Sequence, residues 1–78
     1  MKTVQISLNS IGKVKSFVNT ISQFEYDFDL ISGRYVIDAK SIMGLFSLDL
    51  SKPVELMAHC KDDGEDFLQR IGKFVVKE

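Results

Sequence analysis

The sequence predicts an α+β fold, a two-layer open-faced sandwich in which a four-stranded, mainly antiparallel sheet carries helices on one face. Three observations support this fold class. Four short segments alternate apolar and polar residues, two longer segments repeat apolar residues at helical spacing, and polar turns separate them. The predicted order is strand–helix–strand–strand–helix–strand–helix. A chain of 78 residues is expected to form one domain, residues 1–78.

A short polar turn separates the first predicted strand from the first helix. Residues 4–8 alternate, with Val4, Ile6 and Leu8 on the buried face of a half-buried strand. Residues 9–12 (NSIG) favour a turn. The helix that follows has one apolar face, made by Val14, Phe17, Val18, Ile21 and Phe24.

The second and third strands are predicted to pair as a hairpin. Residues 26–30 alternate, with Asp27 and Asp29 on a solvated face. Gly33 lies in the short turn that follows and is free to adopt a positive φ. Residues 35–38 then form the return strand.

A short apolar helix is predicted within residues 39–50 (AKSIMGLFSLDL). Ser41 stands where an N-cap residue would accept a hydrogen bond from a backbone amide. Gly44 costs about 1 kcal/mol relative to alanine in a helix and limits this one to one or two turns. The apolar residues after Ser41 are too dense for all of them to face the core: Ile42, Met43, Leu45 and Phe46.

One further strand and one further helix complete the predicted fold. Pro53 interrupts the chain just before the strand, which spans residues 54–60 and has Cys60 on its inward face. Asp62 precedes Glu65 at the spacing of a capping box, with Asp in place of Ser. The helix is predicted to run to the end of the chain, with apolar residues at helical spacing: Phe67, Leu68, Ile71, Phe74 and Val75.

Composition argues against several classes of function. The formal net charge of -1 disfavours nucleic acid or an anionic membrane as a partner, because both attract basic proteins. The chain has no apolar run near 18 residues and no recognisable signal peptide, so we expect a cytoplasmic protein without membrane insertion. A single cysteine cannot form an internal disulfide.

The polar residues that suggest a catalytic or metal site all have simpler structural roles. His59 falls on the outward face of the last strand and is expected at the surface. Cys60 is expected to be a small buried hydrophobe rather than a reactive thiol. Helix capping explains an acidic cluster without an ion: Asp62, Asp63, Glu65 and Asp66. We therefore expect no metal, no cofactor and no enzymatic activity.

The stretch Lys40–Leu48 (KSIMGLFSL) resembles the HPr family, the small phosphocarriers of the bacterial sugar phosphotransferase system. The order of elements and the chain length agree with this resemblance. It implies a sheet order of 1-4-2-3, and it implies that Ser41 matches the family's regulatory serine, which a dedicated kinase phosphorylates. The residues after it would form a docking surface for partner proteins: Ile42, Met43, Leu45 and Phe46.

The turn before the first helix departs from the family pattern. A working HPr carries Gly-Ile/Leu-His-x-Arg-Pro there; Enzyme I phosphorylates the histidine and the arginine balances the phosphate. The corresponding stretch here, Asn9–Val14, contains no His, Arg or Pro. We therefore expect no phosphohistidine at this degenerate active-site turn: Ser10, Ile11, Gly12 and Lys13. Lys13 is expected to be a solvated lysine rather than an anion-binding residue.

Three hypotheses for function follow. The first is an HPr-like regulatory or adaptor protein that cannot carry phosphohistidine and binds proteins through Ser41–Phe46. Its partners would be HPr kinase, Enzyme I-like proteins or transcriptional regulators. The second is a phosphocarrier of the phosphotransferase system with a relocated acceptor. The third is a structural interaction domain unrelated to sugar transport.

Overall fold

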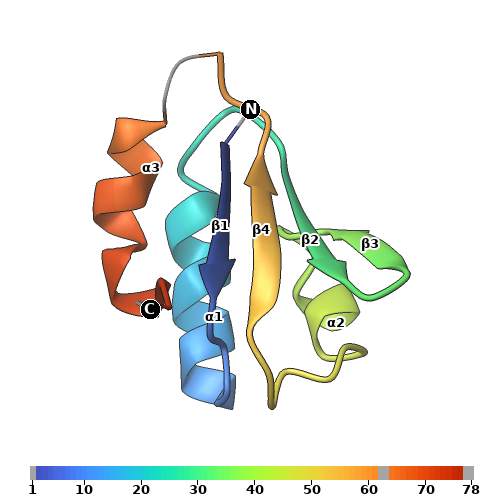
Figure 1. The fold of residues 1–78 in the computed structure, drawn as a ribbon. Coiled ribbons are helices and arrows are strands. Elements are labelled where there is room, and N and C mark those ends of the chain that lie inside the picture. Colours follow the sequence, from blue (N-terminus) through green and yellow to red (C-terminus); the bar gives the residue numbers. More distant parts are fainter. Residues whose placement is uncertain (1, 62–63, 77–78) are drawn as a thin grey trace.

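The computed structural model describes residues 2–61 and 64–76 and contains the predicted order of elements, with one short 3-10 helix added near the end (Figure 1). The elements are β1 (Lys2–Ile6), α1 (Ile11–Ile21), β2 (Phe28–Ser32), β3 (Tyr35–Asp38), α2 (Ile42–Leu45), β4 (Val54–Ala58), α3 (Glu65–Arg70) and η1 (Gly72–Phe74).

The strands form one antiparallel sheet in the order β1-β4-β2-β3, which confirms the predicted fold class and the order that the resemblance implied. A row of apolar residues crosses the sheet at matching register. Val4 pairs with Leu56, Leu56 with Leu30, and Leu30 with Ile37. Successive residues of a strand point to opposite faces, so this row faces the helices and its neighbours face solvent.

The core lies between this sheet face and the helices, and phenylalanine rings dominate it. Phe17 of α1, Phe28 of β2 and Phe67 of α3 are fully buried. The rings of Phe28 and Phe67 meet edge to face with centroids 5.4 Å apart, a favoured geometry for aromatic pairs. Phe17 makes a similar contact with Phe74 at 5.6 Å. The first contact holds α3 against the sheet, and the second joins α1 to η1.

Several predicted boundaries shift by a few residues. Helix α1 begins at Ile11, because Ser10 is its N-cap and accepts a hydrogen bond from the Lys13 amide at 3.2 Å; Gly12 is therefore helical rather than part of a turn. Phe24 lies beyond the end of α1 and packs against the core from the following loop. Strand β2 begins at Phe28 rather than at residue 26, and β4 ends at Ala58.

The end of the chain differs most from the prediction. Helix α3 stops at Arg70 instead of running to the end of the chain, and its N-cap is Gly64, with φ of 71°. Asp62, the predicted cap, lies outside the described residues. After η1 the backbone returns to the sheet: Val75 bridges Ile6, and the Val76 amide donates to the Gln5 carbonyl at 2.9 Å. These bonds cover backbone groups on the edge of β1, and a longer helix would leave those groups open.

Replacing Phe28 with alanine is expected to lower the free energy of unfolding by about 3–5 kcal/mol, because it leaves a cavity among buried rings. Phe46→Ala is the matched control, since that ring is already 44% exposed, and it should cost about 1 kcal/mol or less. Urea denaturation of both variants measures the difference. Equal losses would show that the ring cluster does not dominate the core.

Candidate functional site

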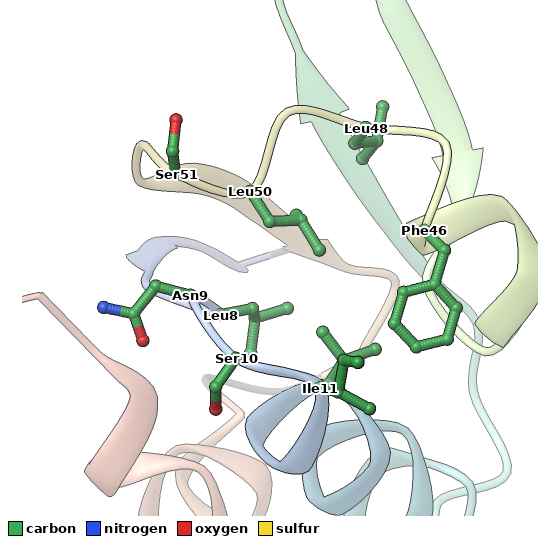
Figure 2. Close-up of a pocket in the computed structure, with 9 residues that line it drawn as sticks. Leu8, Asn9, Ser10, Ile11, Phe46, Leu48, Leu50 and Ser51 are labelled. Atoms are coloured by element: carbon green, nitrogen blue, oxygen red, sulfur yellow. The ribbon is translucent and has the colours of Figure 1, made fainter.

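A groove of about 330 Å³ lies where the start of α1 meets the loop after α2 (Figure 2). Three parts of the chain line it: residues 8–11 with Val14, then Phe46, and then Leu48, Leu50 and Ser51. Figure 2 shows Ile11, Phe46 and Leu50 converging on the groove, whereas Asn9 and Ser51 point away from it. The groove therefore brings the degenerate turn beside the predicted docking residues, which are distant in the sequence.

An exposed apolar surface continues from this groove, and we call it the α1–α2 surface: Ile11, Ile42, Met43 and Phe46. Met43 is 77% exposed and Ile11 is 64% exposed, unusual values for side chains of this size. Ile42 is half-buried. The dense apolar run after Ser41 is thus divided between the core and the surface, as the sequence predicted.

The prediction that Leu45 is a docking residue is wrong. Its side chain is fully buried and belongs to the core cluster, because it lies on the face of α2 that packs against the sheet and α1. It supports the α1–α2 surface from beneath and is not available to a partner.

Ser41 is the N-cap of α2, as predicted, and is exposed. Its Oγ accepts a hydrogen bond from the Gly44 amide at 3.4 Å, and its own amide donates to the Asp38 carbonyl at 3.0 Å. A Cβ added at Gly44 would lie 3.3 Å from Ser41 Oγ, so glycine leaves room beside the hydroxyl. The neighbouring Lys40 ammonium is occupied, because it donates to the Phe24 carbonyl at 2.7 Å.

The residues of the degenerate turn do not all line the same pocket. Ser10 and Ile11 line the groove, whereas Gly12 and Lys13 line a separate hollow with Ser16 and Phe74. Lys13 is exposed. The backbone amide of Lys13 donates a hydrogen bond to Ser10 Oγ, so the Ser10 side chain caps the start of the helix.

Leu48, Leu50 and Ser51 complete the groove, and the sequence alone did not identify them. Leu48 and Leu50 alternate with polar neighbours, a pattern that in hindsight marks an extended, half-buried loop. Asp49 holds this loop by accepting hydrogen bonds from the hydroxyl and the amide of Ser51. The Ser51 hydroxyl, followed by the Ser51 amide, lowers the pKa of Asp49 below its ordinary value of 3.8.

His59, the only histidine of the chain, does not line the groove. It follows β4 and is exposed, as expected, and its Nε2 lies 2.7 Å from Asp29 Oδ2 on β2. Cys60 is buried, also as expected. Within residues 2–61 and 64–76, no three or more His, Cys, Asp or Glu residues are arranged to hold a metal ion. No helix in that part of the chain has the length and apolarity to cross a bilayer.

Comparison with known proteins identifies similarity at the level of family and fold. A family model described as "PTS HPr component phosphorylation site" matches residues 13–77. The solved structures include HPr-C-His from Thermoanaerobacter tengcongensis, which is 30% identical, covers 91% of this chain and 90% of its own, and superimposes with a TM-score of 0.74. No curated protein sequence matches the chain. The family match begins at Lys13 and so excludes Ser10 and Ile11.

Replacing Ser51 with alanine should raise the pKa of Asp49 toward its ordinary value, because both lowering hydrogen bonds involve Ser51 and the hydroxyl bond is the larger cause. A carboxyl pKa that folding lowers adds stability above the unfolded pKa. This contribution is lost as pH falls through the folded value. NMR titration of the Asp49 carboxyl measures the change. Ser47→Ala is the control, because the Ser47 hydroxyl donates to Gly44 rather than to Asp49; an equal shift in both variants would contradict the assignment.

Proposed function

Because the chain belongs to the HPr family of the phosphotransferase system, whose members are phosphocarriers rather than enzymes, we propose that it is a regulatory or adaptor protein of the bacterial cytoplasm. It would bind other proteins of that system through the α1–α2 surface and would not carry phosphohistidine. The single observation that carries this proposal is the pairing of an exposed Ser41 and apolar surface with a turn that lacks histidine.

The geometry of the turn supports the loss of carrier function. A phosphocarrier turn needs a nucleophilic imidazole with backbone donors and a cation to hold the phosphoryl group. Here Ser10 occupies the N-cap of α1, and its hydroxyl is engaged with the Lys13 amide. Ile11, the next residue, projects an apolar side chain into the groove instead. This arrangement suits contact with an apolar group of a partner.

Regulation through Ser41 is the second part of the proposal. The hydroxyl is exposed, and its hydrogen bond to Gly44 is long, so a kinase can reach it at small cost to the helix. A phosphoryl group would add about -1.5 to -2 charges at pH 7 beside Met43, which is 77% exposed. The modification would therefore change which partners the α1–α2 surface accepts, with HPr kinase as the expected modifying partner.

A phosphocarrier with a relocated acceptor is the alternative, and the bond between His59 and Asp29 is the observation that favours it. Asp29 fixes the imidazole orientation, and Lys61 lines the same hollow as His59. Glu25 lines that hollow as well, and its charge would oppose a phosphoryl group. The arrangement is more simply an exposed ion pair, of the kind that contributes about 0–1 kcal/mol.

Incubation with Enzyme I and phosphoenolpyruvate is expected to leave the chain without acid-labile phosphate, because the family's acceptor residue is missing from the turn. Phosphate transfer is measured by mass spectrometry at neutral pH, with a His-bearing HPr as the positive control. Stoichiometric labelling that disappears in His59→Ala would contradict the proposal and support a phosphocarrier whose acceptor is His59.

Incubation with HPr kinase and ATP is expected to place one phosphate on the chain, and Ser41→Ala should abolish it. The matched control is Ser47→Ala, because Ser47 is exposed and lies just past the other end of α2. Labelling that persists in Ser41→Ala, or that is lost equally in Ser47→Ala, would contradict Ser41 as the site. If no phosphate is attached, the proposal of regulation by this kinase is wrong, and the hypothesis of a structural interaction domain is favoured.

A further inference from the structure

The two edges of the sheet differ in whether another segment of the chain pairs with them. On the outer side of β1, Val75 and Val76 pair with the strand and cover its backbone groups. On the outer side of β3, no other described segment pairs with the strand (Figure 1). Open edges are templates for pairing with another chain, and proteins usually block them with short strands, lysine or proline. Strand β3 is short, but its first two residues are apolar and exposed: Tyr35 is 69% exposed and Val36 is 62% exposed.

The register shows which backbone groups of β3 point outward. The Ala39 amide donates to the Phe28 carbonyl, so the Phe28–Ala39 pair is hydrogen-bonded. Hydrogen-bonded pairs alternate with non-bonded pairs along an antiparallel ladder. Val36, opposite Ile31, is therefore in a non-bonded pair, and its N–H and C=O point away from β2. Asp38 is in the same phase; the Ser41 amide already donates to its carbonyl, which ends the open edge.

We propose that β3 pairs with β3 of a second copy of this chain, antiparallel, about a two-fold axis at Val36. The Val36 residues of the two protomers then exchange N–H and C=O bonds. In this register Arg34 of one protomer lies opposite Asp38 of its partner, twice by symmetry. The outward phase of the Val36 backbone is the one that such a pairing requires.

Charge complementarity is the reason to choose a second copy over an unrelated peptide. Arg34 and Asp38 flank Val36 at equal distances in the sequence and carry opposite charges, so the edge is complementary to itself when reversed. Asp38 uses one carboxylate oxygen, Oδ1, on the Lys40 amide, which leaves Oδ2 for the guanidinium. A shift of the axis to Ile37 would instead place Val36 opposite Asp38.

The side chains on the open face agree with this register. Val36 lies opposite Ile31 within the sheet, on the face away from the helices. Pairing at Val36 would join these residues of both protomers into one apolar strip across the junction, the type of cross-strand contact that stabilises sheets. The interface is small, so the association is expected to be weak. The proposal does not depend on phosphorylation of Ser41.

Sedimentation equilibrium of the full chain tests the pairing. The weight-average mass should rise from 8.8 kDa toward twice that value as concentration increases from about 10 µM to about 1 mM. Arg34→Asp and Asp38→Arg should each weaken self-association by about tenfold or more, because each places like charges opposite one another. An equimolar mixture of the two variants should associate again, since opposite charges then face each other at both ends of the junction.

The control for Arg34→Asp is Lys15→Asp, which makes the same change of charge on the exposed side of α1. Circular dichroism of each variant checks that it is folded, because Asp38 also caps the Lys40 amide. A mass that stays at 8.8 kDa at about 1 mM would overturn the proposal, whether or not another protein binds the edge. Equal weakening by Lys15→Asp, or failure of the mixed variants to associate, would also overturn it.

Discussion

The insertion of β4 between β1 and β2 is the constraint on which the rest of the structure depends. Strand β4 follows the other three strands in the sequence, yet it pairs with both β1 and β2. Its residues Val54, Leu56 and Ala58 are buried beneath the helices. Its first residue, Val54, lies opposite Ile6 at the end of β1. This register brings the loop before β4 next to the turn after β1. The groove lies at that meeting point, so it follows directly from sheet topology.

Two serines cap helices, Ser10 at the groove and Ser41 at the start of α2, and they differ in what they support. Ser10 begins an eleven-residue helix, and its hydroxyl holds the Lys13 amide in a turn that fixes the start of α1. Ser41 begins a helix of four residues, whose stability comes from the buried Leu45 rather than from its own length. A change at Ser41 is therefore compatible with the fold. Of its neighbours, Met43 is exposed, whereas Ile42 also packs against the core. The proposed regulatory site and the proposed docking surface can coexist there because the buried Leu45 holds the helix in place.

Local patterns predicted the strands, the hairpin and the cap at Ser41, because alternation and capping depend on residues close in the sequence. Gly33 in the hairpin turn has φ of 59°, as its position predicted. The groove and the pair between His59 and Asp29 join residues far apart in the chain, and no local signal specifies such partners. The predicted length of the last helix was wrong because it also depends on a partner far away in the sequence. Ile71 and Phe74 do keep helical spacing, but pairing with β1 competes with the helix and takes the backbone after η1.

The return of residues 75 and 76 to β1 has a consequence for synthesis on the ribosome. The first strand leaves the exit tunnel early, but its outer edge is covered only after nearly the whole described chain has followed. Strand β4, which covers its inner edge, also emerges late. A nascent chain therefore carries an unpaired β1 until β4 and residues 75 and 76 have emerged, a state in which unpaired strand edges favour misassembly. Lys2 and Gln5 on that strand are polar and exposed, and polar residues on a strand lower its tendency to aggregate.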